Sequence, residues 1–177
     1  GLGKASLDGI RTFLQELIDA GLRYVLDADA LRTEVLPLVR DKAIITPHVG
    51  EYKRLFNVDL SDMEVEERAE EVLKRAREEK LTIALKGRID VVSDGKEVYL
   101  NRTGNSGMSV GGTGDVLSGI ISAFAARGLS LLHAALLGMY FNGLAGDGAK
   151  EKYGFHFTAS MMLEEIPYVM KPYDKEG

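Results

Sequence analysis

The sequence contains no cysteine, no tryptophan and only four prolines among 177 residues. Without cysteine it can form neither a disulfide framework nor a thiolate metal site or nucleophile, which fits a reducing, cytoplasmic location. No apolar run is long enough to span a bilayer, and the first ten residues lack a signal-peptide pattern. A net charge of −5 argues against a sequence-independent grip on nucleic acid. These absences predict a soluble cytoplasmic globule that binds neither membranes nor nucleic acid.

What is present is an alternation of short apolar strands and amphipathic helices, which fits one α/β domain over 1–177 with a mainly parallel sheet. The strand signals include "LTIALKG", which has no polar alternation and is therefore expected to be buried on both faces. The turn at Asp94 and Gly95 predicts a hairpin. Helices are expected at 7–20, 50–56, 61–80, 113–127, 130–150 and 158–170.

The segment "GNSGMSVGGTGDVLSG" at 104–119 places six glycines and one aspartate before a helical run. Glycines let a ligand approach the backbone closely, and the free amides of a helix start carry partial positive charge. A phosphate group would be stabilised there, with Asp115 beside it as a base. The alternative is a structural glycine turn with an ordinary first-turn acid. Spacing alone leaves the two interpretations open, since the segment is neither a Walker loop nor a dinucleotide fingerprint.

Three motifs in register carry a resemblance: "TPHVGEYKRLF", "LKGRIDVVSDG" and "GNSGMSVGGTGDVLSGIISAFAARG". Together with "VLDADAL" and the opening "GLG", they resemble the ADP/ATP-dependent NAD(P)H-hydrate dehydratase family of the ribokinase-like superfamily. The resemblance implies a ribokinase-like α/β fold, and the family domain has further strands upstream of its "GLG". We therefore expect the N-terminal strands of the domain to be missing from this chain.

Members of this family dehydrate NADH or NADPH hydrate (NADHX, NADPHX), using ADP or ATP to phosphorylate the hydroxyl before phosphate leaves. The resemblance implies that Asp115 takes the hydroxyl proton, and that Gly3, His48, Gly50 and Asp115 bind the hydrated coenzyme. The residues implied in nucleotide binding are Lys86, Gly87, Arg88, Ile89, Asp90, Asn105, Ser106, Gly107, Met108, Ser109, Val110, Gly111, Gly112, Thr113 and Gly114.

Glu51 resembles the superfamily acid that organises Mg²⁺ near the phosphates; the alternative is an ordinary first-turn carboxylate. Asp27 and Asp29 follow a strand, where they could line the cleft or cap the next helix. Asn142 stands where family members commonly carry histidine. Met161 replaces a common aspartate, which leaves Ser160 as the expected cap of the last helix.

Two other functions stay open at this point. One is a ribokinase-like kinase for a small alcohol such as a vitamin precursor, although "TPHVGE" resembles the dehydratase pattern more closely. The other is a nucleotide-binding or assembly fragment without turnover. A homo-oligomer and a fused epimerase domain in the full protein are further expectations.

Overall fold

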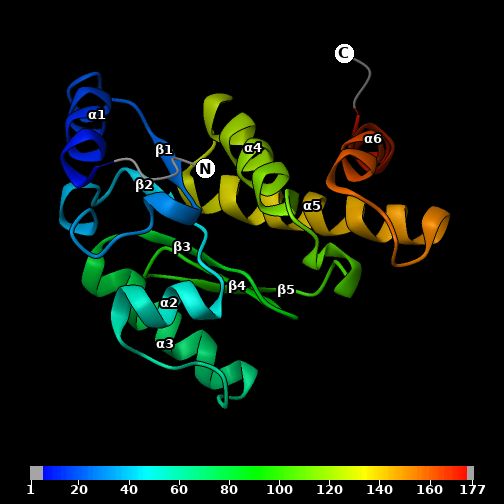
Figure 1. Ribbon diagram of the computed structural model, residues 1–177, viewed down its shortest axis with the longest axis horizontal. Coiled ribbons are helices and arrows are strands. Elements are labelled where there is room, and N and C mark those ends of the chain that lie inside the picture. The colour runs from blue at the N-terminus through cyan, green and yellow to red at the C-terminus, as the bar shows by residue number, and fades with distance from the viewer. Residues whose placement is uncertain (1–5, 175–177) are drawn as a thin grey trace.

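The computed structural model describes residues 6–174. Within them, one sheet is flanked by helices on both of its faces (Figure 1). The sheet has five strands in the order β1-β2-β3-β4-β5. They are β1 (Tyr24–Leu26), β2 (Ala43–Ile45), β3 (Thr82–Leu85), β4 (Asp90–Ser93) and β5 (Val98–Asn101).

Two kinds of strand pairing make up this sheet. β1, β2 and β3 are parallel, with Val25 opposite Ile44 and Ile45 opposite Ile83. β4 and β5 are antiparallel to their neighbours and form the hairpin predicted around Asp94 and Gly95. The α/β class is thus confirmed, and the expected mainly parallel sheet is a mixed one.

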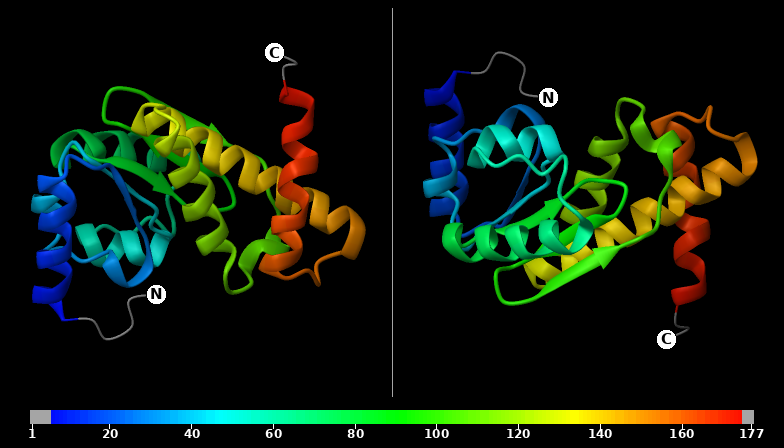
Figure 2. Two further views of the ribbon diagram at one scale, coloured as in Figure 1. Left: turned by 90° about the horizontal axis from the view of Figure 1, so that it is seen from above. Right: turned by 90° about the horizontal axis from the view of Figure 1, so that it is seen from below.

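The helices form two layers, one on each face of the sheet, and α6 crosses the C-terminal half of α5 (Figure 2). One face carries α1 (Leu7–Asp19), α2 (Val49–Phe56) and α3 (Val65–Glu79), and the other carries α4 (Thr113–Ala126) and α5 (Leu131–Tyr153), followed by α6 (Ala159–Met170). None of the helices within residues 6–174 has the length and apolar character that crossing a membrane requires.

The strands in the middle of the sheet send alternate side chains into two separate cores. Ile45 and Ile83 join the core beneath α1, α2 and α3, whereas Ile44 and Ala84 join the core beneath α4 and α5. All four residues of β3 are buried, as the lack of polar alternation predicted. Burial on both faces fixes the register of these strands, because a one-residue slip would exchange the two sets.

The ends of the helices follow from their capping residues. Ser6 Oγ accepts a hydrogen bond from Gly9 N–H at the start of α1, and Gly21 follows its end with a φ of +69°. α6 differs from the prediction: Thr158 caps it by accepting from Met161 N–H, and Ser160 lies inside the first turn. Thr158 takes this role because its extended backbone precedes the helix, as a capping residue requires.

Candidate functional site

The carboxyl ends of the parallel strands place three of the singled-out side chains at one edge of the sheet. Asp27 follows β1, His48 lies beyond β2, and Lys86 follows β3. His48 and Lys86 form a parallel bridge, and Lys86 N–H donates to Pro47 O at 2.8 Å. In open α/β sheets, ligands bind outside this edge.

A charged group, which we call the strand-end cluster (Asp27, His48, Glu51 and Lys86), forms at this edge. Lys86 Nζ lies 2.8 Å from Asp27 Oδ1 and 3.8 Å from Glu51 Oε2. Asp27 Oδ2 also accepts from Ser118 Oγ of α4 at 3.4 Å, so it links the sheet to the helix behind it. Asp27 makes no side-chain cap for the short helical turn that follows, and it lies outside the wall of the cavity described below, so neither of the two alternative roles is observed.

His48 and Glu51 also cap α2 reciprocally. His48 Nδ1 accepts from the backbone N–H of Gly50 at 3.0 Å and of Glu51 at 3.3 Å, and Glu51 Oε2 accepts from His48 N–H at 2.8 Å. Because Nδ1 accepts these bonds, the ring proton is on Nε2. The His48 side chain is 56% exposed and Glu51 9%, so the imidazole remains open to a ligand while the carboxylate is largely enclosed.

The glycine-rich loop is held in place from α5. Asp147 accepts hydrogen bonds from Gly104 N–H and Asn105 Nδ2, both at 2.9 Å, and Asn105 Oδ1 accepts from Gly107 N–H at 3.0 Å. Thr113 Oγ1 donates to Met108 O at 2.7 Å. Sequence reasoning missed Asp147; a lone carboxylate in the otherwise uncharged stretch 131–149 of α5 was the available signal.

The loop ends where α4 begins. Gly112 precedes the helix with a φ of +95°, a conformation that side chains other than glycine rarely adopt. A Cβ on Gly114 would stand 3.3 Å from Asp27 Oδ2 and 3.8 Å from Lys86 Nζ, so the helix start directly faces the strand-end cluster. Asp115, in the first turn, is exposed, and its side chain makes no hydrogen bond or ion pair with any of residues 6–174.

A cavity of about 1230 Å³ separates the loop from the sheet edge. It brings together most of the predicted nucleotide residues, namely Lys86, Gly87, Arg88, Ile89, Asp90, Asn105, Ser106, Met108, Ser109, Val110, Thr113 and Gly114, and also His48. The predicted residues outside its wall are Gly50, Glu51, Gly107, Gly111, Gly112 and Asp115. Gly3 lies outside the described residues.

Asp90 stabilises the turn after Lys86 rather than facing the cavity with a free charge. Its Oδ1 accepts from Gly87 N–H at 3.0 Å and its Oδ2 from Asn101 Nδ2 at 2.9 Å. Burial raises the pKa of the Asp90 carboxyl above its ordinary value, although these hydrogen bonds and Lys86 act in the opposite direction.

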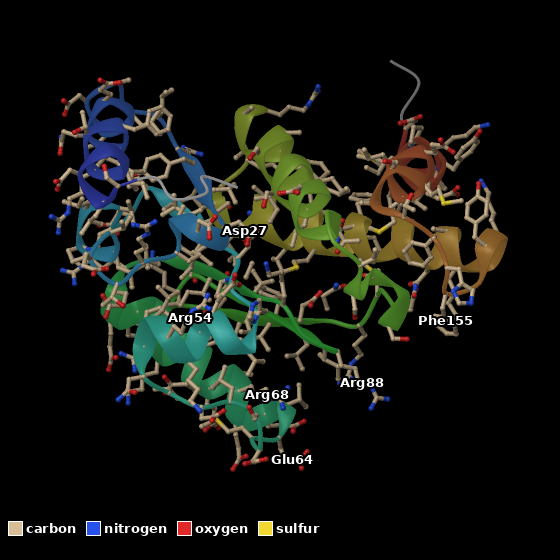
Figure 3. The ribbon with its side chains drawn as sticks, in the orientation of Figure 1. Asp27, Arg54, Glu64, Arg68, Arg88 and Phe155 are labelled. Atoms are coloured by element: carbon tan, nitrogen blue, oxygen red, sulfur yellow. The ribbon has the colours of Figure 1, made fainter. Side chains whose placement is uncertain are left out.

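Three arginines line the same cavity without a carboxylate partner among residues 6–174: Arg68, Arg88 and Arg102. Arg68 comes from α3 and donates only to Ser61 O, at 3.1 Å; Arg68 and Arg88 lie below Asp27 in Figure 3. A chain of net charge −5 thus has unpaired positive charge on one wall, which favours a polyanionic ligand. Sequence reasoning missed Arg68, because α3 reads as a solvated face, and it missed Arg102, which follows β5 outside the recognised motifs.

No cluster of three or more His, Asp or Glu side chains suited to a metal ion occurs within residues 6–174. Glu51 is engaged by His48 N–H and lies near Lys86. Magnesium takes few protein ligands when it arrives with substrate phosphates. The residues present therefore fit a Mg²⁺ ion carried by a nucleotide, with Glu51 acting at most indirectly.

The family model for NAD(P)H-hydrate dehydratase matches residues 1–168. The chain belongs to this family. A relative described as ADP-dependent (S)-NAD(P)H-hydrate dehydratase, from Cenarchaeum symbiosum, is 44% identical over 176 residues. That match covers 99% of this chain and 61% of the relative, so the chain spans less than two thirds of its length. The Nnr bifunctional NAD(P)H-hydrate repair enzyme of Pyrobaculum aerophilum is 39% identical over 100% of this chain and 35% of its own length.

Solved structures agree with the family assignment. A Bacillus subtilis ADP/ATP-dependent NAD(P)H-hydrate dehydratase, co-crystallized with ATP/Mg²⁺, superposes with a TM-score of 0.83 at 27% identity. The match covers 97% of this chain and 62% of that one. A ribokinase-like superfamily protein from Enterococcus faecalis has a TM-score of 0.73 at 23% identity, over 97% of this chain and 61% of its own. The second likeness shows the fold alone, and the expected ribokinase-like fold is confirmed.

Proposed function

We propose that this chain carries the nucleotide-binding and catalytic part of an enzyme that dehydrates NADHX or NADPHX at the expense of ADP or ATP. The observation that carries the proposal is the cavity between the glycine-rich loop and the strand-end cluster. Its wall combines the start of α4, Lys86 and three arginines without carboxylate partners. The 44% identity to an ADP-dependent dehydratase over 99% of the chain supports this reaction.

The nucleotide would lie along the glycine-rich loop. Free backbone N–H groups at the α4 start and the Lys86 ammonium would stabilise the charge of the transferring phosphoryl group. Mg²⁺ would come with the nucleotide and neutralise phosphate charge there. The Bacillus subtilis relative co-crystallized with ATP/Mg²⁺ supports both ligands for this chain.

Asp115 would act as the general base. As its carboxylate takes the hydroxyl proton of the hydrate, the hydroxyl oxygen forms a bond to the terminal phosphorus, and the remaining nucleotide leaves as ADP or AMP. Phosphate then departs from the ring carbon with the C–O electron pair, and the neighbouring carbon loses a proton, which restores the double bond. A carboxylate that is exposed and without an internal partner is available for this transfer.

The coenzyme side of the site rests on His48 and Gly50, with Gly3 proposed from the motif. The exposed His48 ring lies at the edge of the cavity, with Nε2 3.6 Å from Glu51 Oε1, and its Nε2–H would donate to the hydrated coenzyme. We also propose a single domain over 1–177 and a cytoplasmic location, the latter supported by the lack of cysteine. The bifunctional relatives support a fused epimerase domain in the full protein. Self-association stays a prediction.

The dehydratase family match weighs against a vitamin-precursor kinase.

The test of the proposal is the recovery of reduced-nicotinamide absorbance when the protein is mixed with hydrated NADH or NADPH, Mg²⁺ and either ADP or ATP. We expect recovery that requires the nucleotide, with one phosphate released per coenzyme. Phosphorylation of a vitamin precursor without coenzyme recovery would contradict the proposal, and so would ADP binding without any turnover even when the rest of the family domain is supplied.

A further inference from the structure

The first half of the glycine-rich loop lies directly against α5. A Cβ on Gly143 would overlap Thr103 Oγ1, and a Cβ on Gly146 would overlap Met108 Sδ, so glycine at these two positions lets the helix and the loop come this close. Met108 also packs against the small core around Phe157, which α5 and α6 share. The loop therefore takes its position from α5, and a change on this face of the helix would be transmitted to the loop.

Asp147 is a charged side chain of α5 that contacts this loop with both of its oxygens. Oδ2 accepts from Gly104 N–H and Oδ1 accepts from Asn105 Nδ2, each at 2.9 Å. Asn105 Oδ1 in turn accepts from Gly107 N–H at 3.0 Å, so both polar atoms of the Asn105 side chain are engaged within the protein. Asp147 itself lies outside the cavity wall, whereas Gly104 and Asn105 are part of it. Any effect of Asp147 on a ligand therefore passes through the loop.

The charge of Asp147 does not suit a loop that binds phosphate, because a nearby negative charge repels an anion. Its two acceptor oxygens do explain its presence. An amide at position 147 would keep one acceptor oxygen and turn an NH₂ donor toward one of the two N–H groups that now donate to Asp147. The bond to Gly104 N–H also holds a residue whose φ is +97°, a conformation for which glycine is suited. Asp147 thus fixes the shape of the loop rather than its electrostatic potential.

We propose that Asp147 is a positioning residue for the phosphate donor: directly and through Asn105, it holds the backbone of 104–107 in the conformation in which the loop lines the cavity. This role rests on the proposed function for the identity of the ligand, a nucleoside di- or triphosphate. Because Asp147 acts through the nucleotide loop, its replacement should weaken nucleotide binding and leave the binding of the hydrated coenzyme unchanged.

The test exchanges the acid and the amide, with Asp147→Asn and Asn105→Asp made alone and together. Each single variant sets two amides or two carboxylates against each other, whereas the double variant can form all three hydrogen bonds again at unchanged net charge. Calorimetry measures ADP affinity, and mass spectrometry follows amide hydrogen exchange of 103–109 without ligand.

For each single variant we expect ADP to bind about tenfold more weakly and 103–109 to exchange faster. The double variant should recover most of the ADP affinity and the slow exchange. In turnover assays, Asp147→Asn should raise the KM for ADP about tenfold and leave the KM for the hydrated coenzyme as it was. Glu151→Gln is the matched control, since Glu151 is an exposed acid one turn further along α5, and it should change none of these quantities.

Three results would overturn this role. ADP affinity in Asp147→Asn equal to that of the unchanged protein would show that the loop does not depend on Asp147. A double variant that binds ADP no better than the single variants would show that the contact with Asn105 is not the cause. An equal rise in KM for ADP and for the coenzyme would assign Asp147 a general part in stability. If the unchanged protein does not bind ADP, the proposed function fails together with this role, whereas ADP binding that is indifferent to the variants overturns this role alone.

Discussion

The strand-end cluster and the unpaired side chains on the same cavity differ in how their polar groups are satisfied. Lys86, Asp27, Glu51 and His48 hold one another at hydrogen-bond or ion-pair distances. Four other side chains, which we call the unpaired set, differ from this cluster: Arg68, Arg88, Arg102 and Asn142. Among residues 6–174, the three arginines have no carboxylate partner, and the side-chain amide of Asn142 has no hydrogen-bond partner. The cluster is therefore organised before any ligand arrives, whereas the unpaired set is available for one.

Asp115 gives the largest expected effect and the strongest test of this contrast. Asp115→Asn should lower turnover by about 10²- to 10⁴-fold, because the amide cannot accept the hydroxyl proton, while ADP still binds. Coenzyme recovery and ADP calorimetry on the same preparation measure both. Asp8→Asn is the matched control, since Asp8 is likewise an exposed first-turn acid, in α1. Equal turnover in the two variants would reduce Asp115 to an ordinary helix-terminal charge.

Glycine conformation gives the next effect. Gly112→Ala should destabilise the protein by about 1–3 kcal/mol and weaken ADP binding, because alanine is strained at a φ of +95° and its Cβ would stand 3.0 Å from that of Ala159. Gly111→Ala is the control: no atom lies within 4 Å of a Cβ there. Denaturant unfolding and ADP titration of both variants are the measurements. Equal behaviour of the two would show that the loop does not depend on this backbone conformation.

Replacing Arg68 tests the unpaired set, and we expect a smaller effect than for the two preceding variants. Arg68→Gln should weaken ADP binding about fivefold at low salt, equal to about 1 kcal/mol, and make the affinity less sensitive to salt. The loss follows from removing one positive charge from the wall. Arg54→Gln, in α2 and outside the cavity wall, serves as the control in titrations at several ionic strengths. If Arg54→Gln has the same effect as Arg68→Gln, then only net charge matters and the position of Arg68 does not.

Asp90 gives the smallest expected effect, on the pH dependence of stability. Its pKa is raised by burial above the ordinary value of 3.8, so the folded protein holds the proton more tightly than the unfolded chain. Asp90 therefore lowers stability as pH rises from about 3.8 through its folded pKa. Unfolding of the unchanged protein and of Asp90→Asn, measured from acid to neutral pH, should show the variant gaining relative stability across that window. A difference that stays constant with pH would contradict the assignment.

Much of the fold could be predicted from the sequence, and so could the strand-end cluster, but not the unpaired set. Strand ends are visible in a sequence, so Asp27, His48 and Lys86 could be identified as neighbours from their position after β1, β2 and β3. The glycine-rich loop was visible from its composition. Arg68 lies on α3 and Asp147 on α5, and only tertiary packing brings these helices to the cavity and the loop, while Arg102 follows β5 without a pattern that marks it as a binding residue. The Thr158 cap was missed since two hydroxyl residues stood near the start of α6.

The most direct test of the account is hydrogen exchange measured by mass spectrometry, with and without ADP and Mg²⁺. The account predicts slower amide exchange across 104–118, where the loop and the α4 start would contact the nucleotide, and no change in α1 (Leu7–Asp19), which lies away from the cavity wall. Unchanged exchange across 104–118 at saturating ADP, or slowing confined to α1, would contradict it.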